Sequence, residues 1–508
     1  MKKRIGFITA ILLLGLAGCG QKQETQVQKE NVAETTEVIP ITEMREDENQ
    51  QELLAILEKN LSIMEKNPKD TAARLEVIRS QIGLKNYDVA LVNLSLLMSI
   101  DPQIPAIYDY YVQISKEQDK LSLANTAVSK ANLYGVQEFL DKIPKDPVFS
   151  IKGGSFENKI SVEITSQDSD AEIYYRCYGE DMNSSLRLYT APIDILTGEV
   201  RITSYVLKDG IPSNTEEMTY QVGYKGTQVV FQDEVVEQAV RNELETNYGQ
   251  IPDAITDIDC WRLRNLDLEC NGRNINLEDL RWMTNLQNLY IYNSEKITDY
   301  NPLKYCKNID SLNINYGNVT NLDFVKSMPN LQYLNVEHNQ IRDISVLKEC
   351  KNLEYLYIYN NPIKNVEEVL AVNKNLMALE ISDSQMTDYS VLTELKNLQM
   401  LSIHGLEFDA TQVAKLTELS QLILQMDWNK RNATGWDYKQ QLPDISFVKE
   451  MTKLEYLYLN GISKGEQLQY LHGLKNLENL YLYNSDATKD KEAIRNLKAA
   501  LPNCNIRY

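Results

Sequence analysis

Hydrophobic positions in the C-terminal half of the chain recur with a fixed period. The pattern L-x-x-L-x-[LIV] returns every 22 or 23 residues, and each copy alternates hydrophobic and polar positions as a half-buried strand does. A fixed period of this length is typical of a solenoid, in which neighbouring copies bury one continuous core. The copies begin at Leu286, Ile309, Leu331, Leu353, Leu376, Leu398, Leu419, Leu454 and Leu477, with a weaker copy at Leu263.

Two copies carry the full motif: "LQYLNVEHNQI" from Leu331 and "LEYLYIYNNPI" from Leu353. We expect Asn339 and Asn361 to close the turn that follows each strand. This pattern resembles the leucine-rich repeat. The preceding segment "VVFQDEVVEQAVRNEL" resembles the helical N-terminal cap of internalin-type repeat proteins, and "LKAALPNCNIRY" is interpreted as a closing cap. Residues 226–508 are therefore predicted to form an α/β leucine-rich repeat domain.

Tyrosines occupy many strand positions between the motif leucines. Because side chains alternate across a strand, leucines pointing into the core leave these tyrosines on the opposite, concave face of the parallel sheet. Neighbouring strands lie about 4.8 Å apart, so equivalent tyrosines should stand side by side. The predicted concave-face ligand-binding residues are Tyr290, Tyr292, Tyr333, Tyr355, Tyr357, Tyr359, Tyr456, Tyr458, Tyr481 and Tyr483.

Two interpretations of these tyrosines remain open. Tyrosine is a good strand residue and forms cross-strand ladders, so the rings could serve the sheet alone. Exposed aromatic patches on a concave surface usually mean recognition, however, and tyrosine gives a large rigid contact area at low entropic cost. Polar residues, among them Glu337, Glu380 and His404, separate two aromatic groups. We favour a binding surface.

An insertion stretches one repeat to 35 residues, between Leu419 and Leu454. Its extra residues include Trp428, Trp436 and Tyr438. Insertions in solenoids map to loops, often beside the binding face, and exposed tryptophan is a common anchor of interfaces. The sequence predicts a second ligand contact here, with a tryptophan pair that covers the repeat core as the alternative.

The region from 51 to 143 has a helical pattern that matches itself at a spacing of 34 residues. Pro68 recurs as Pro102, and Ala90 recurs as Ala124, which indicates helix pairs with a small residue at a close contact and a breaker behind it. The region resembles tetratricopeptide repeats over about two and a half units, although Leu121 replaces the bulky aromatic residue in the second unit. An unrelated helical bundle is the alternative.

From 146 to 224 the hydrophobic period falls to two, in short runs such as "ISVEI", "AEIYY" and "VRITSYVL". Short alternating strands between turn residues predict a small β-sandwich. The segments "PVFSIKGGSF", "YTAPI" and "VLKDGIPSNT" resemble the immunoglobulin-like C-terminal domain of chitobiases and hexosaminidases, although Tyr178 stands where that family usually has an aspartate. In those enzymes the domain is not catalytic, which implies a spacer.

The N-terminus carries export signals. A basic start and an apolar run end in "LAGC", which resembles the lipobox of bacterial lipoproteins. The resemblance implies a signal peptide over residues 1–18, lipid attachment at Cys19 and a location on the extracytoplasmic face of a cell membrane. Residues 19–50 are polar, contain no aromatic residue and predict a disordered tether.

Composition excludes several classes of function. Fifty-two basic and 72 acidic side chains give a net charge of −20, which argues against nucleic acid because phosphate neutralisation dominates that binding. No phosphate loop, catalytic serine motif, zinc motif or dinucleotide motif occurs, so we predict no catalytic residues, no cofactor and no metal. The predicted function is non-catalytic recognition of a protein or glycan. A scaffold built on the helical repeats is the alternative, and a carbohydrate-processing enzyme is a more distant one.

Overall fold

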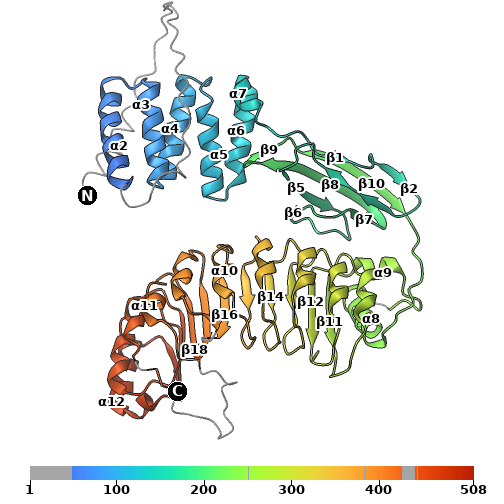
Figure 1. The fold of residues 1–508 in the computed structure, drawn as a ribbon, viewed down its shortest axis with the longest axis vertical. Helices are drawn as coiled ribbons and strands as arrows, with labels where there is room; N and C mark the ends of the chain where they lie inside the picture. The colour runs from blue at the N-terminus through green and yellow to red at the C-terminus, as the bar shows by residue number, and fades with distance from the viewer. Residues whose placement is uncertain (1–48, 250, 383–384, 426–440, 443) are drawn as a thin grey trace, which may run out of the picture. The chain divides into compact units, whose positions relative to one another are not determined.

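The computed structural model divides the chain into two compact units (Figure 1). The described residues are 49–249, 251–382, 385–425, 441–442 and 444–508. The first unit contains residues up to Lys152, together with Ile164–Arg176 and Ile202–Met218. The second unit contains Gly153–Glu163, Cys177–Arg201 and Thr219–Tyr508. The predicted signal peptide, Cys19 and the predicted tether up to residue 48 lie outside the described residues, and the last two residues assigned to the tether begin α2.

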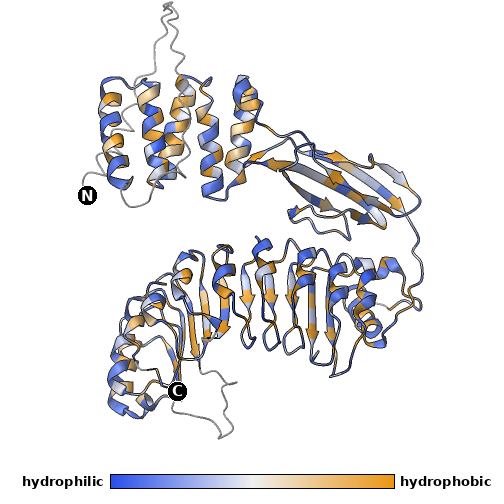
Figure 2. Cartoon of the chain, in the orientation of Figure 1, coloured by the Kyte–Doolittle hydropathy of each residue, from blue (hydrophilic) through white to orange (hydrophobic). Residues whose placement is uncertain are grey.

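The first unit begins with consecutive helices, each of which packs against the next from α2 to α6. Figure 2 shows hydrophobic and hydrophilic turns alternating along them, as amphipathic packing requires. The helices are α2 (Asn49–Lys66), α3 (Thr71–Gly83), α4 (Tyr87–Ile100), α5 (Ala106–Glu117), α6 (Leu121–Tyr134) and the short α7 (Gln137–Leu140).

Local chemistry fixes the helix ends and the packing of this region. The Asp70 side chain accepts a hydrogen bond from the backbone N–H of Ala73 and so caps α3. Gly135 ends α6 at φ 67°, a left-handed conformation that glycine adopts without strain. Ala90 and Ala124, the small residues of the 34-residue pattern, are fully buried. The N-terminal region is thus built from helical repeats.

The strands that follow form one larger sheet and two small pairs. The larger sheet has the order β2-β10-β8-β5-β6, with β9 on β8, while β1 pairs with β4 and β3 pairs with β7. These strands belong in part to each unit. Their bounds are β1 (Val148–Phe149), β2 (Gly154–Phe156), β3 (Ile160–Val162), β4 (Ile164–Thr165), β5 (Glu172–Tyr178), β6 (Arg187–Leu188), β7 (Ile193–Ile195), β8 (Thr197–Lys208), β9 (Ile211–Pro212) and β10 (Glu216–Gly223).

Two helices cover the start of the solenoid in the second unit. In α8 (Glu234–Tyr248), Val236, Val240 and Leu244 recur at helical spacing and are buried against the solenoid core. Helix α9 (Asp257–Arg262) begins with a capping box, in which the side chains of Thr256 and Asp259 each accept from the other residue's backbone N–H. The predicted cap segment is therefore helical.

The solenoid strands form one parallel sheet, which has eleven strands among the described residues. Each strand lies beside the next strand in the chain, as expected when every repeat contributes one strand. Figure 1 shows them in series from β11 to β18. The strands are β11 (Asn265–Glu269), β12 (Asn288–Tyr292), β13 (Ser311–Asn313), β14 (Tyr333–Asn335), β15 (Tyr355–Tyr357), β16 (Ala378–Ser382), β17 (Met400–His404), β18 (Gln421–Gln425), β19 (Tyr456–Asn460), β20 (Asn479–Tyr483) and β21 (Asn505–Arg507).

Short helices return the chain from each strand to the next. Most of them are short 3-10 helices, and a longer α-helix precedes β21. They are η2 (Leu277–Trp282), η3 (Asn301–Tyr305), η4 (Asp323–Ser327), η5 (Ser345–Glu349), α10 (Val366–Leu370), η7 (Tyr389–Glu394), α11 (Ala410–Val413), η8 (Ser446–Glu450), η9 (Gly465–Leu471), η10 (Asp486–Lys489) and α12 (Lys491–Ala500).

The motif residues form the interior of the solenoid. Leu334, Leu356 and Leu379 pair in register on successive strands and are completely buried. The Asn339 amide donates to the carbonyl of Ile314 at 2.7 Å and accepts from the N–H of Val319 at 2.8 Å. Asn361 makes the same kind of bonds one repeat later. Both asparagines close the turns as predicted, because they satisfy backbone groups that the turn would otherwise leave unpaired.

The six cysteines in the described residues are free thiols. Cys306 and Cys350 are buried in the solenoid core, as their shared repeat position predicts, and burial raises the pKa of each thiol to about 12. Cys260 and Cys270 are also buried, whereas Cys504 is half-buried. None of the described helices has the length and apolar character that a transmembrane span needs.

Candidate binding surface on the solenoid sheet

The residues between the motif leucines lie on one face of the sheet, the face that the sequence predicts to be concave, hereafter the sheet face. Strand register arranges them in three columns that run across the repeats. Nine of the ten predicted tyrosines on this face are partly or largely exposed. They divide into an N-terminal tyrosine patch (Tyr290, Tyr292, Tyr333, Tyr355 and Tyr357) and a C-terminal tyrosine patch (Tyr456, Tyr458, Tyr481 and Tyr483).

The N-terminal tyrosine patch spans β12 to β15. Tyr333 and Tyr355 are register partners on neighbouring strands, and their ring centroids lie 6.0 Å apart. The ring of Tyr333 lies 5.3 Å from that of Tyr357, and Tyr290 and Tyr292 stack at 6.2 Å. Such ring pairs contribute about 0.5–1.5 kcal/mol each beyond the area they bury. The ladder interpretation and the binding interpretation are therefore compatible, because the rings hold one another in place while part of each stays open.

The C-terminal tyrosine patch occupies β19 and β20. Tyr481 lies at its centre, with ring centroids 5.2 Å from Tyr456, 6.1 Å from Tyr458 and 5.9 Å from Tyr483. The guanidinium of Arg507, on β21, lies 5.7 Å from the Tyr481 ring centroid. This geometry is that of a cation–π contact, so the last strand already supplies this patch with a positive charge.

Tyr359 differs from the other predicted tyrosines. Its side chain is buried, with 4% exposure, and its ring stacks on the imidazole of His404 at a centroid distance of 3.4 Å. The ring of His338 meets it edge-on at 5.1 Å, and Tyr316 stacks on His338 at 4.1 Å. The expectation that Tyr359 faces solvent is wrong, because the histidine two strands away covers a position that strand alternation alone leaves open.

A pair of carboxyl groups lies beside the N-terminal tyrosine patch. Glu337 follows β14 and Glu380 lies on β16, and their side chains are hydrogen-bonded across the intervening strand β15. Burial, and then the negative charge of Glu380, raise the pKa of Glu337 to about 8, although a hydrogen bond from the Asn335 amide at 3.2 Å opposes the shift. Two close carboxyl groups with one hydrogen bond between them hold a proton in common.

His404 extends this network onto β17. Its Nε2 is hydrogen-bonded to Glu380, and the side-chain amide of Gln425 lies 2.9 Å from the same nitrogen. The other ring nitrogen, Nδ1, is buried without a hydrogen-bond partner. The hydroxyl of Ser402, which pairs in register with Glu380, is likewise buried and unpartnered. These two polar atoms are unsatisfied positions of the sheet face, and both side-chain atoms of Asn460 on β19 are also buried without a partner.

Charge on the sheet face is one-sided. From β11 to β20, the three columns of described residues contain no lysine or arginine. The same columns contain the carboxylates Asp267, Glu269, Glu337 and Glu380. The electrostatic character of the face therefore comes from acids set among aromatic rings.

The sequence did not indicate the role of Tyr316. Tyr316 and His338 adopt left-handed backbone conformations, at φ 52° and 55°, in turns where Asn293 and Asn360 have the same conformation. A bulky residue at such a position is strained, which asparagine avoids. The signal that could have found this pair is the replacement of the repeat's asparagine by an aromatic ring in two consecutive turns.

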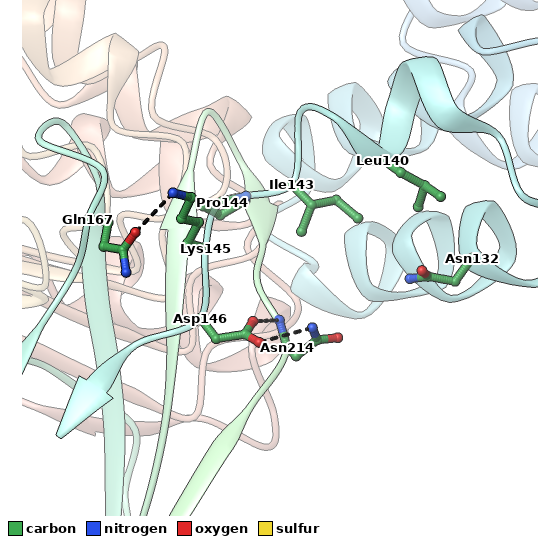
Figure 3. Close-up of a pocket in the computed structure, with 8 residues that line it drawn as sticks. All are labelled: Asn132, Leu140, Ile143, Pro144, Lys145, Asp146, Gln167 and Asn214. Carbon is green, nitrogen blue, oxygen red and sulfur yellow. Dashed lines mark hydrogen bonds between the residues drawn. The ribbon is translucent and has the colours of Figure 1, made fainter.

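Other predicted and possible sites add little to this surface. Trp428, Trp436 and Tyr438 lie outside the described residues, so their proposed contact is untested. A hollow of about 510 Å³ in the first unit is lined in part by Lys145, Asp146, Gln167 and Asn214 (Figure 3). These polar groups bond one another, Asp146 accepting from Asn214 and Lys145 donating to Gln167. Among the described residues, no cluster of three or more His, Cys, Asp or Glu side chains is arranged for a metal.

Comparison with known proteins identifies the repeat. A family model described as leucine-rich repeats (2 copies) matches residues 329–371. Comparison with curated protein sequences gave no significant match.

The solved structures that this chain is similar to include three bacterial proteins. An internalin, inlF, of Listeria monocytogenes is 23% identical, covers 55% of this chain and 89% of its own, and has a TM-score of 0.38. The functional domain of InlJ from the same species is 19% identical, covers 55% and 69%, and scores 0.38. A leucine-rich repeat protein of Leptospira interrogans is 23% identical, covers 49% and 62%, and scores 0.36. The matched repeats and the continuous register of β11 to β21 show that the C-terminal region of this chain is a leucine-rich repeat solenoid.

Proposed function

We propose that this protein is a non-catalytic receptor that binds a protein or glycan on the sheet face of its leucine-rich repeats. The observation that carries the proposal is the pair of tyrosine patches, whose rings are partly exposed on a face opposite a completely buried leucine core. Soluble proteins seldom leave contiguous aromatic surface open unless it meets a partner. The patches are also rigid, because neighbouring rings contact one another, so binding costs little side-chain entropy.

The rest of the chain supports presentation of this surface in the proposal. The lipobox-like "LAGC" motif makes Cys19 a lipid anchor on the extracytoplasmic face of a bacterial membrane. Residues 19–50 act as a tether, and the strands of 146–224 act as a spacer of the chitobiase C-terminal type. A single acyl chain holds a protein only marginally, so stable anchoring requires more than one chain at this cysteine.

A second candidate function is docking of an envelope protein on the helical repeats, interpreted here as tetratricopeptide-like. The observation that favours it is the exposure of large apolar side chains on these helices, among them Val92 at 52% and Leu133 at 69%. Deletion of residues 226–508 distinguishes the two candidates, because a docking platform keeps its partner without the solenoid. A receptor that uses the sheet face loses its partner in the same deletion.

The test of the proposed function is a glycan array and a surface-protein capture performed with the full chain. A variant carrying Tyr333→Ser, Tyr355→Ser and Tyr357→Ser removes three of the five rings of the N-terminal tyrosine patch, and Tyr248→Ser is the control. Tyr248 is 46% exposed at the end of α8, in the same unit but away from the sheet face. The proposal expects the wild type and the control to capture one partner that the folded triple variant does not. Equal capture by all three contradicts it.

A further inference from the structure

The one-sided charge of the sheet face restricts the kind of partner it can hold. Its carboxylates lie within an aromatic surface, and among the described residues the sheet-face columns lack a lysine or arginine until Arg507 on the last strand. Charged groups across an interface are arranged so that opposite potentials meet, and a like charge placed opposite another costs several kcal/mol. An acidic segment or an anionic glycan is therefore a poor fit, whereas a basic segment is a good one.

The Glu337–Glu380 pair is the point where a positive group fits best. In the free protein the two side chains are hydrogen-bonded to each other, with a proton in common. Both remain partly exposed, with the Glu380 side chain at 18%, so a ligand can reach them. A guanidinium offers five N–H donors in a planar fork, and an ammonium offers three, so either can replace the shared proton and satisfy both carboxylates.

The neighbouring side chains suit a cation as well. Tyr333 and Tyr357 lie close enough to the carboxyl pair that the charges of Glu337 and Glu380 raise the pKa of both phenols, after burial as the larger cause. Their rings are 5.3 Å apart and offer faces for a cation–π contact. On the C-terminal tyrosine patch a cation of the protein itself already occupies such a ring face, since Arg507 lies over Tyr481.

An independent observation marks the same place as incomplete. Ser402 is 1% exposed, and its hydroxyl has no hydrogen-bond partner although it stands in register beside Glu380. Strand alternation puts it on the sheet face, because Leu401 and Ile403 on either side point into the core. A buried polar atom without a partner is unfavourable because it has lost its hydrogen bonds to water and gained none in return. A donor-rich group seated at Glu380 would supply the missing hydrogen bond.

We infer that the sheet face binds a basic protein segment and seats one arginine or lysine side chain of that segment on Glu337 and Glu380, against the rings of Tyr333 and Tyr357. The inference rests on the proposed function and makes the partner a protein with a positively charged segment. Binding has a defined proton balance: the cation takes the place of the shared proton, which is released to solvent.

The proton balance predicts a pH dependence. Besides Glu337, the titratable groups at this site are Glu380, the imidazole of His404 on β17, and the phenols of Tyr333 and Tyr357. Because the pKa of Glu337 is raised in the free protein, a cation must displace a proton below about pH 8 and meets an ionised pair above it. Affinity for a basic segment therefore rises as the pH increases from 6 to 8.

The experiment uses the full chain and a library of acetylated, amidated nonapeptides. Each sublibrary fixes Arg, Lys, Gln or Glu at the central position and is mixed at the others. The expected result is that the Arg and Lys sublibraries bind about tenfold more tightly than the Gln sublibrary. This ratio corresponds to a difference in binding free energy of about 1.4 kcal/mol. Glu337→Gln and the double variant Glu337→Gln, Glu380→Gln should each reduce this preference.

The matched control is Glu450→Gln on η8, which replaces one carboxyl group by an amide as Glu337→Gln does. The Glu450 side chain is 72% exposed, on a returning 3-10 helix and not on a sheet strand. The control should keep the preference for basic peptides in full. Either the absence of a preference in the wild type or an equal loss in Glu450→Gln overturns the inference.

A second measurement separates this inference from the proposed function. A neutral-glycan array is probed with the same proteins and with the N-terminal patch variant. Capture of a neutral glycan that is lost without the tyrosines but kept in Glu337→Gln overturns the basic-segment inference and leaves the proposed function standing. Calorimetry in two buffers of different ionisation enthalpy reports on the proton directly: the wild type should release protons on binding the Arg sublibrary at pH 7, and Glu337→Gln should not.

Discussion

The two tyrosine patches are built from the same residue at equivalent repeat positions, yet their surroundings are opposite. The N-terminal patch adjoins a pair of carboxyl groups, Glu337 and Glu380, that share a proton. The C-terminal patch adjoins Arg507, whose guanidinium lies over Tyr481. The aromatic area alone therefore does not decide what the surface binds. The charge next to each patch decides whether it still has room for a cation.

A second contrast lies within one column of the sheet face. Tyr359 and Tyr483 occupy the same repeat position, two residues after Tyr357 and Tyr481, but the first is 4% exposed and the second 37% exposed. The difference comes from His404, which stacks on Tyr359. A tyrosine in the same column is thus buried in one repeat and exposed to solvent in another.

The largest expected effect is a difference in stability between these two tyrosines. Tyr359→Ser should lower the free energy of unfolding by about 3 kcal/mol, because it removes a buried ring and leaves a cavity beside His404. Tyr483→Ser should lower it by less than about 1 kcal/mol. Urea unfolding of both variants measures the difference, and equal losses would show that column position, not burial, sets the cost.

The next effect is on binding. The triple variant Tyr333→Ser, Tyr355→Ser and Tyr357→Ser should weaken capture of basic peptides about tenfold or more, since it removes the rings of the N-terminal tyrosine patch that lie beside the carboxyl pair. Tyr458→Ser with Tyr481→Ser should have a smaller effect, because Arg507 repels a basic partner there. Titration of the Arg sublibrary against both variants measures the ratio, and a larger loss at the C-terminal patch would reverse the comparison.

The carboxyl pair also predicts how stability depends on pH. The folded-state pKa of Glu337, about 8, lies above the ordinary glutamate value of 4.5, so the folded state binds more protons between these values. The stability contribution is fully present below about pH 4.5 and is lost as the pH rises through about 8. Glu337→Gln should flatten this decline. Thermal unfolding from pH 5 to pH 9 measures the slope, and an unchanged slope in the variant contradicts the assignment.

The smallest expected effect concerns Arg507. Its replacement by glutamine removes the guanidinium that lies over Tyr481 and should improve binding of basic peptides about twofold, by relieving weak repulsion at a partly solvated site. The same titration measures it at low and high salt, where the gain should shrink. A loss of affinity in this variant would indicate that the partner carries an acidic group at this end.

The periodic parts of this fold could be predicted from sequence, because each repeat carries the same pattern of hydrophobic and polar residues. The spacing of Leu334, Leu356 and Leu379 gives the strand, its direction and its buried side, and Asn339 gives the turn. The helical cap follows from the segment "VVFQDEVVEQAVRNEL", in which Val236, Val240 and Leu244 recur at helical spacing. These features depend on neighbours a few residues away or one repeat away.

The candidate site could be predicted only in outline. Strand alternation places a tyrosine on one side of the sheet, but it does not say whether another side chain covers it, which decided the burial of Tyr359. The hydrogen bond between Glu337 and Glu380 joins columns two strands apart, and it depends on rotamers and on the exact register. No periodic rule contains that information.

The most direct test is calorimetric titration of one arginine-centred peptide into four versions of the full chain. They are the wild type, the N-terminal patch triple variant, Glu337→Gln with Glu380→Gln, and the doubly substituted control Tyr248→Ser with Glu450→Gln. The account predicts that the wild type and the control bind alike while the other two, still folded, bind at least about tenfold more weakly. Equal affinity for all four proteins would contradict it, and would leave the tyrosines as cross-strand structure of the sheet.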